Sequence, residues 1–335
     1  MRKYSVVIPV YNGEKFIKNC YGSLLDQTYE EWEAIFVDDG SSDHSLEEIE
    51  ALAAKDIRVK VSHQNNSGQI QARYKGIEEA KGEYCLFLDV DDTLKNNTLS
   101  VINLALEKYE APDIVMFNGE KVNQKTGERF PVWPDLCENE KLYSGKEYNK
   151  LRGSVLDGRR LNNICFKAIK SSVLKDNDLQ MSFENIRTEE DLLMQLPYFD
   201  RAEDLLYIPK KYYIYNINEA SVTNTYDPNL FKSACYLYKE LMKYGKKWGL
   251  ENNSERCSKR FLLSTISSVV KDAHYLGYRE FTLKLSQTRK NKIFKMTSDK
   301  IPNDMPKSRI AYIRMVKMKF DYLCYILGKK KKIVY

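Results

Sequence analysis

The first third of the chain alternates short apolar runs with helical patterns, and this alternation constrains the fold more than any other feature. Apolar, largely β-branched runs predict strands near residues 4–8, 32–37, 57–61, 83–88 and 113–117. The segments between them have the spacing of amphipathic helices. Strands that alternate with helices of about 10–15 residues are typical of a mostly parallel sheet flanked by helices, so we expect an α/β fold. Ligands of such sheets bind beyond the carboxyl ends of the strands.

Polar clusters follow three of these predicted strands, at residues 9–12, 38–43 and 89–92. The last cluster, Asp89-Val90-Asp91-Asp92, has three carboxylates within four residues, which repel one another unless solvent or a cation neutralises them. Carboxylates at i and i+2 can share a divalent cation that also binds phosphate oxygens. The structural alternative is a solvated turn in which Asp92 caps the next helix. Three scattered histidines and seven scattered cysteines without a CxxC pair argue against zinc, so we expect Mg²⁺ or Mn²⁺.

The second half of the chain has a different character. Residues 118–160 are polar and aromatic and predict an irregular insertion with a helix near 144–156, and strands follow near 205–208 and 212–215. From residue 228 onwards the pattern is helical. We therefore predict a domain at 1–225, with a nucleotide-binding half (1–117) and an acceptor half (118–225), and a helical C-terminal region at 226–335.

The C-terminal tail is strongly basic. Residues 284–335 hold 15 lysines and arginines against 3 acidic residues, although the whole chain has a net charge of only +6. A single helix over 308–327 would gather its apolar side chains on one face, ahead of Lys329–Lys332. A basic amphipathic helix of this kind is typical of contact with an anionic membrane, so residues 306–335 predict such a contact. The alternatives are a helix packed on the body and, with no binding motif to support it, nucleic acid, which we do not expect.

No run of about 18 apolar residues and no signal-peptide pattern is present, and the scattered cysteines favour reduced thiols. We therefore expect a cytoplasmic protein that is peripheral on the inner face of the cell membrane.

An ordered series of short motifs resembles the opening of the family 2 glycosyltransferases, which have the GT-A fold. The series comprises VVIPVYN at residues 6–12, SLLDQTY at 23–29, VDDGSSD at 37–43, NSGQ at 66–69 and LDVDD at 88–92. This resemblance implies a GT-A nucleotide-sugar-binding fold. It also implies inverting transfer of a sugar from a nucleotide-diphosphate donor, typically a UDP-sugar, to a glycan hydroxyl. The implied acceptor is linked to polyprenyl diphosphate, in the synthesis of a capsule, exopolysaccharide or other surface glycan.

The same resemblance implies roles for residues at the strand ends. Pro9 and Tyr11 would lie along the nucleotide base, and Asp39 would hydrogen-bond it. Arg73 would reach the nucleotide. In the third cluster, the resemblance places Asp89 near the ribose, makes Asp91 the main ligand of Mg²⁺ or Mn²⁺, and places Asp92 toward the metal or the sugar.

Inverting transfer also needs a base that takes the proton of the acceptor hydroxyl. The family has an "ED" motif about 100 residues beyond the DxD, and Glu190-Asp191 lies at that distance. The resemblance therefore implies that Asp191 is the base, with Glu190 as the alternative. The residues alone also fit an ordinary helix start with Thr188 as its cap. Tyr212–Asn216 and Ser221–Thr223 resemble the family's next segment, which we expect to close the site.

Several motifs are absent. The chain has no GxGxxG after the first strand and no GxxxxGK[ST], which argues against a dinucleotide dehydrogenase and a P-loop enzyme. Residues 195–199 do not form the QxxRW motif of processive polysaccharide synthases, so we expect transfer of a single sugar. Two alternatives remain: a catalytically inactive nucleotide-sugar-binding member of the family, and a sugar nucleotidyltransferase.

Overall fold

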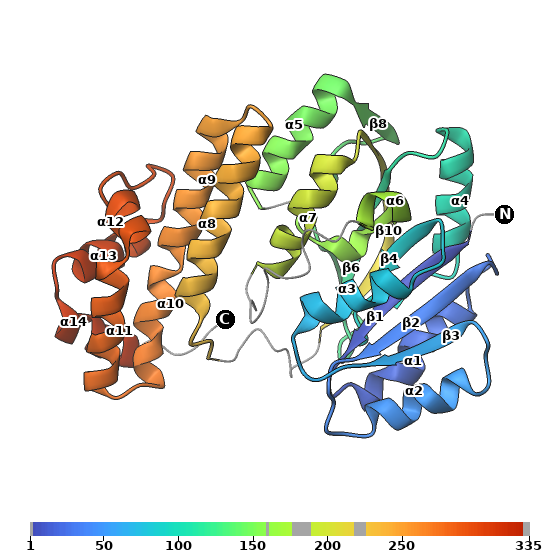
Figure 1. Cartoon of the computed structure of the whole chain (residues 1–335), viewed down its shortest axis with the longest axis horizontal. Helices are drawn as coiled ribbons and strands as arrows, with labels where there is room; N and C mark the ends of the chain where they lie inside the picture. Colours follow the sequence, from blue (N-terminus) through green and yellow to red (C-terminus); the bar gives the residue numbers. More distant parts are fainter. Residues whose placement is uncertain (1–2, 159–160, 176–188, 218–225, 331–335) are drawn as a thin grey trace. The chain divides into compact units, whose positions relative to one another are not determined.

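The computed structural model describes residues 3–158, 161–175, 189–217 and 226–330 (Figure 1). The chain forms two compact units. The first, which we call the sheet unit, comprises Met1–Val155, Arg159–Asn185 and Glu190–Glu219. The second, the helical unit, comprises Leu156–Gly158, Ile186–Glu189 and Ala220–Tyr335. Each unit is described by itself below.

The sheet unit is built on one mixed sheet with the strand order β3-β2-β1-β4-β9-β6-β10-β5, to which β7 and β8 add at β6 and β10. Its strands are β1 (Tyr4–Val10), β2 (Trp32–Asp38), β3 (Val59–His63), β4 (Tyr84–Phe87), β5 (Thr93–Leu94), β6 (Ile114–Asn123), β7 (Arg129–Pro131), β8 (Lys141–Ser144), β9 (Lys167–Lys170) and β10 (Asp204–Ile217). Strands β1 to β4 pair in parallel, and β9 runs antiparallel to both β4 and β6. The predicted α/β class with a mostly parallel sheet is confirmed.

Helices accompany the strands of this unit: α1 (Glu14–Leu25), α2 (Ser45–Ala53), α3 (Gln69–Glu79), α4 (Thr98–Lys108), α5 (Gly145–Leu156), the 3₁₀ turn η1 (Ile164–Phe166), α6 (Ser171–Leu174) and α7 (Glu190–Arg201). Every residue of β1 and β2 is buried, which is why these strands read as continuous apolar runs. Helix α3 packs closely on β1, because a Cβ at Gly76 would lie only 2.3 Å from Cγ1 of Val7. This close packing sets the position of Arg73, one turn earlier on the same helix.

Two predicted elements of the sheet differ from the structure. The third strand begins at Val59, two residues later than expected, and Ile57 is 97% exposed. The two strands expected near 205–208 and 212–215 are one long strand, β10, whose register against β6 shifts between Tyr207 and Tyr213. That irregularity interrupts the alternation of the side chains, so the sequence pattern showed two short strands.

The helical unit contains α8 (Leu230–Lys247), α9 (Glu251–Ser264), α10 (Ile266–Lys271), the 3₁₀ turn η4 (Asp272–His274), α11 (Tyr278–Lys290), α12 (Lys292–Ser298), α13 (Lys307–Lys317) and α14 (Asp321–Lys330). Its main core joins buried side chains of α9 to α14, among them Ile266, Val270, Phe281, Leu285 and Ile313.

The single amphipathic helix predicted over 308–327 is wrong. Lys319 has a φ of +63°, a left-handed conformation that ends α13 and separates it from α14. Ile313, Val316 and Cys324 lie in the core of the helical unit, whereas Phe320 and Leu323 are 48% and 47% exposed. The predicted apolar face is therefore divided between a buried part and an exposed turn. Among the residues that the structure describes, no helix is long and apolar enough to cross a membrane.

Candidate active site

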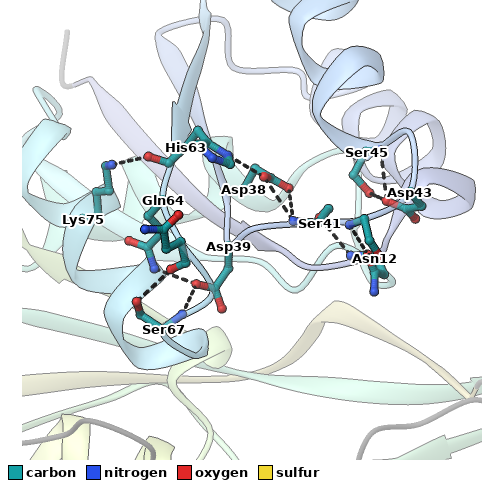
Figure 2. Close-up of polar contacts among 12 residues, drawn as sticks. Asn12, Asp38, Asp39, Ser41, Asp43, Ser45, His63, Gln64, Ser67 and Lys75 are labelled. Carbon is teal, nitrogen blue, oxygen red and sulfur yellow. Dashed lines mark hydrogen bonds and ion pairs between the residues drawn. The ribbon is translucent and has the colours of Figure 1, made fainter.

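The loops that follow β1 and β2 are joined to each other by hydrogen bonds (Figure 2). Asn12 has a left-handed backbone with a φ of +51°, and its backbone N–H donates to Oγ of Ser41 at 3.0 Å. In return, the N–H of Ser42 donates to Oδ1 of Asn12 at 2.8 Å. The N–H of Gly13 donates to Oγ of Ser45, at the start of α2. The polar clusters at residues 9–12 and 38–43 thus form one rim at the carboxyl ends of the two strands.

The two neighbouring aspartates of this rim hold different loops. The buried Asp38 accepts from the N–H of Ser41 and pairs with Nδ1 of His63 at 2.8 Å (Figure 2). Asp39 reaches the loop before α3. Its Oδ1 accepts from Nε2 of Gln64 and the N–H of Ser67, both at 2.8 Å, and its Oδ2 accepts from the N–H of Gly68 at 2.9 Å. Oδ2 keeps a lone pair for a further donor, which a base N–H can supply.

Pro9 and Tyr11 lie at the same rim in different environments. Pro9 is buried within β1, opposite Val37 of β2. Tyr11, just beyond the end of the strand, is 53% exposed, which leaves its ring available for stacking on a planar base.

The DVDD turn after β4 is fastened to β10. Both carboxylate oxygens of the buried Asp92 accept hydrogen bonds, from the hydroxyl of Tyr213 at 2.6 Å and from the N–H of Asn216 at 2.8 Å. The side chain of Asn216 donates to the carbonyl of Asp91. Burial raises the pKa of Asp92 to about 8, and the charges of Asp89 and Asp91 add to this effect. Asp92 therefore has a structural function that the sequence did not indicate: it ties the turn to β10.

A buried guanidinium connects the DVDD turn to the predicted base. Arg73 on α3 is 1% exposed, and its Nη1 donates to Oδ1 of Asp191 at 2.6 Å. Its Nη2 donates to Oδ1 of Asp89 at 2.9 Å, and Gln69 donates to the same oxygen. Burial alone would lower the pKa of Arg73, but Asp191 and Asp89 raise it well above its ordinary value. Arg73 is thus a permanent cation between two carboxylates that are distant in the sequence.

Asp191 is the second residue of α7, and its carboxylate is also held from the other side. Oδ2 accepts from the N–H of Ile164, at the start of η1, at 3.3 Å. Asp191 lies in the first turn of the helix, near the positive end of the helix dipole. Glu190, the first residue of α7, is partly buried, and its charge acts on Arg73. Two of the predicted features, Thr188 and Ser221–Thr223, lie outside the residues that the structure describes.

The residues that the resemblance assigned to a metal supply too few ligands for a cation by themselves. They fit a cation whose remaining ligands come from a bound substrate. No group of three metal-binding side chains converges among the described residues. Asp91 supplies one partly exposed carboxylate, and Asp89, which faces Arg73, is its neighbour. Mg²⁺ is commonly held by one or two protein carboxylates with phosphate oxygens completing its shell, so this donor set fits Mg²⁺ or Mn²⁺ bound with a diphosphate.

The structure brings Arg73, Asp89 and Asp191 into direct contact, while Tyr11 and Asp39 belong to the adjacent rim. Sequence reasoning named Tyr213 and Asn216 only within a segment expected to close the site. It missed Lys167 and Gln195, which donate to carbonyls of the loop beside Asp191. The aromatic alternation of residues 212–216 was a signal for Tyr213. Lys167, a lysine in an apolar strand, was a signal that we did not use.

A mostly parallel sheet flanked by helices, with carboxylates at one edge, defines an α/β protein, and comparison with known proteins gives the particular family. The family model described as glycosyl transferase family 2 matches residues 5–177. Glycosyltransferase GlyG of Streptococcus pneumoniae serotype 4 is 31% identical over 225 residues, which cover 66% of this chain and 73% of GlyG. The uncharacterized glycosyltransferase EpsJ of Bacillus subtilis is 31% identical over 247 residues, 73% of this chain and 70% of EpsJ. The chain belongs to glycosyl transferase family 2.

Solved structures agree on the fold. The crystal structure of Staphylococcus aureus TarS 1–349 in complex with UDP-GlcNAc superposes with a TM-score of 0.70 at 20% identity, covering 98% of this chain and 90% of that chain. The predicted GT-A fold is thereby confirmed. The protein is a glycosyltransferase of the GT-A class with a C-terminal helical region.

Proposed function

We propose that the protein transfers one sugar from a UDP-sugar to a hydroxyl of a glycan acceptor, with inversion at the anomeric carbon. The observation that carries this proposal is the ion-paired cluster of Asp191, Arg73 and Asp89. It joins the start of α7 to the carboxyl edge of the sheet, so a proton acceptor lies beside the DVDD turn. UDP is the preferred nucleotide because the similar TarS structures were solved with UDP and with UDP-GlcNAc.

In this proposal Asp191 takes the proton of the acceptor hydroxyl as that oxygen attacks the anomeric carbon. The bond from that carbon to the diphosphate breaks, and UDP leaves with the electron pair. Arg73 fixes Oδ1 of Asp191, so Oδ2 is the oxygen that faces the acceptor. Asp91 would hold a divalent cation, which stabilises the negative charge of the departing diphosphate when it is bound. Tyr11 stacks on the base and Asp39 accepts from it.

UDP release from a panel of UDP-sugars, beginning with UDP-GlcNAc and with Mg²⁺ or Mn²⁺ present, tests this proposal. We expect Asp191→Asn to lower the rate by about 10²–10⁴-fold, because a general base contributes roughly this factor. Asp200→Asn, in the last turn of the same helix, is the matched control and retains the rate. An unchanged rate in Asp191→Asn removes Asp191 as the base. Failure to release UDP from any sugar favours an inactive family member, and release of pyrophosphate from a nucleoside triphosphate favours a nucleotidyltransferase.

The acceptor and its location are further parts of the proposal. We place a polyprenyl-diphosphate-linked glycan at the inner face of the cell membrane, in the synthesis of a surface polysaccharide. The charge of the helical region supports this: residues 226–335 hold 25 lysines and arginines against 9 acidic residues, a net charge of +16. In the turn between α13 and α14, Met318 and Phe320 are 62% and 48% exposed beside Lys319, and in the first turn of α14 Tyr322 and Leu323 are 66% and 47% exposed. Apolar side chains that protrude from a basic surface suit an anionic bilayer.

Flotation with vesicles of phosphatidylcholine and phosphatidylglycerol tests the membrane contact without using activity. We expect the wild-type protein to float with these vesicles and not with phosphatidylcholine alone. The double variant Phe320→Ser/Leu323→Ser is expected to lose most of this binding. Leu104→Ser, which changes a 64% exposed leucine of the sheet unit, is expected to retain it. Equal flotation of all three proteins contradicts a contact through the α13–α14 turn.

A further inference from the structure

A buried lysine lies near the candidate base. Lys167, the first residue of β9, is completely buried. Its Nζ donates to the carbonyl oxygen of Leu161 at 2.9 Å and to that of Asn163 at 2.6 Å. A lysine is almost never fully buried without partners, because an unsolvated ammonium group is costly. Here the partners are two carbonyls of the loop that precedes η1.

The same loop reaches Asp191 from its other side. The N–H of Ile164 donates to Oδ2 of Asp191. Gln195, one turn further along α7 and also completely buried, donates from Nε2 to the carbonyl of Asn162 and to that of Asp191. Lys167 and Gln195 of α7 therefore hold the loop of residues 161–164 by hydrogen bonds to its carbonyl groups. The last residue of the loop, Ile164, donates its N–H to Asp191.

The charges are consistent with this arrangement. Burial lowers the pKa of Lys167 to about 7, and the negative charge of Asp191 opposes this decrease, as does the Cys165 thiol. The ammonium group is thus near enough to interact with the carboxylate, although no direct contact joins them. Arg73 fixes Oδ1 of Asp191, whereas the loop held by Lys167 fixes Oδ2, the oxygen proposed to take the proton.

We propose that Lys167 is a positioning residue of the transfer reaction: it holds the 161–164 loop so that the Ile164 N–H orients Oδ2 of Asp191 toward the acceptor hydroxyl. This inference rests on the proposed function, because it acts through the proposed base. Lys167 touches neither nucleotide nor sugar in this scheme, so its removal should affect the chemical step and leave donor binding unchanged.

Lys167→Met tests the inference, because methionine keeps an unbranched apolar side chain and removes the ammonium group. We expect kcat to fall by about 10–100-fold, since a misplacement of about 1 Å in a catalytic group can cost this factor. The KM for the UDP-sugar and the calorimetric affinity for UDP should stay within about twofold of the wild type, as expected for an interaction made only in the transition state. Lys170→Met, on the same strand with a 35% exposed side chain, is the matched control and should retain kcat.

The double variant Lys167→Met/Asp191→Asn separates positioning from a general structural effect. If Lys167 acts through Asp191, the lysine substitution lowers kcat in the wild-type background and lowers it no further in the Asp191→Asn background. An equal decrease in both backgrounds, or a parallel loss of UDP affinity, overturns the inference. If Lys167→Met does not fold, Lys167→Gln, which keeps a polar donor, replaces it in the same double-variant comparison. An equal decrease of kcat in both backgrounds, or a parallel loss of UDP affinity, then overturns the inference.

The two proposals fail in different ways. If Asp191→Asn retains the wild-type rate, the assignment of the base is wrong and the inference about Lys167 falls with it. If Asp191→Asn is inactive while Lys167→Met has the wild-type kcat, the base stands and only the positioning role is lost.

Discussion

The sheet unit and the helical unit use charge in opposite ways. Residues 1–225, which include the whole sheet unit, hold 28 lysines and arginines against 38 acidic residues, a net charge of −10. Residues 226–335, all within the helical unit, have a net charge of +16. In the sheet unit, Asp39 and Asp92 at the strand ends are buried and hydrogen-bonded. The buried Arg73 pairs with the partly exposed Asp89 and Asp191. In the helical unit, many cations remain at the surface in partly exposed pairs. From this difference we expect that burial, more than the distance between two charges, decides how much the loss of an ion pair lowers the free energy of unfolding.

The largest expected effect is at Arg73. Arg73→Met leaves Asp191 and Asp89 close together without their cation, so we expect a loss of about 3–5 kcal/mol in the free energy of unfolding at neutral pH. Urea unfolding followed by circular dichroism measures this loss. Arg129→Met is the matched control in the same unit: Arg129 pairs with Glu120 but is 56% exposed, so we expect less than about 1 kcal/mol. Similar losses in the two variants would contradict the role of burial.

The helical unit contains an exception that sharpens the comparison. Asp272 is buried in an ion pair with Lys284 at 2.6 Å, with side-chain exposures of 7% and 15%. Burial raises the pKa of Asp272 to about 6, although Lys284 opposes this shift. Because the folded state holds the proton more tightly than the unfolded chain, the group stabilises the fold below about pH 4. That stabilisation, about 3 kcal/mol, is lost as the pH rises through about 6.

Hydrogen exchange of the backbone amides of α10 and α11 measures this effect within the helical unit. The stability of the wild type relative to Asp272→Asn should be greater at pH 4 than at pH 7 by about 2 kcal/mol, since asparagine cannot titrate. A difference between the two proteins that is the same at both pH values would show that Asp272 does not titrate in this range.

Asp39 tests whether the rim of the site is a structural or a ligand-binding feature. Asp39→Asn replaces a carboxylate that accepts from Gln64 and from the N–H groups of Ser67 and Gly68. We expect a loss of about 1–3 kcal/mol in unfolding free energy, because these donors keep only a weaker partner. Calorimetry should also show weaker binding of UDP. Ser42→Ala, at an exposed hydrogen bond of the same rim, should change neither quantity appreciably. Weaker UDP binding with unchanged stability would mean that Asp39 serves the ligand alone.

The sequence predicted the sheet, its polar edge and the family because these depend on local patterns. Continuous apolar runs indicated β1, β2 and β4, and the order of the motifs indicated the GT-A fold. The contact of Arg73 with Asp191 joins residues 118 positions apart, and no periodicity reports such a pairing. The resemblance implies that Arg73 reaches the nucleotide, and the structure adds that its guanidinium lies between two carboxylates.

The supporting residues were hidden for a related reason. No strand was predicted around Lys167, and the pattern at Asp92 also fits the cap of a helix. Their partners, the carbonyls of Leu161 and Asn163 and the hydroxyl of Tyr213, become neighbours only when the sheet has formed. In the tail, the sequence pattern correctly predicted helix but not where the helix ends. Lys319 has a left-handed backbone conformation, so two helices, α13 and α14, form in place of one.

The smallest expected effect is at the tail, where Lys317 and Asp299 form an ion pair of 2.5 Å with side-chain exposures of 47% and 66%. This pair is as short as the pair of Arg73 and Asp191, which are 2% and 25% exposed. Water screens the exposed charges and ordering the two long side chains opposes their attraction, so Lys317→Met should change the free energy of unfolding by less than about 0.5 kcal/mol. Urea unfolding at low and high salt measures it. A loss near that of Arg73→Met would mean that distance, and not burial, controls these pairs, and the contrast between the two units would then have no energetic basis.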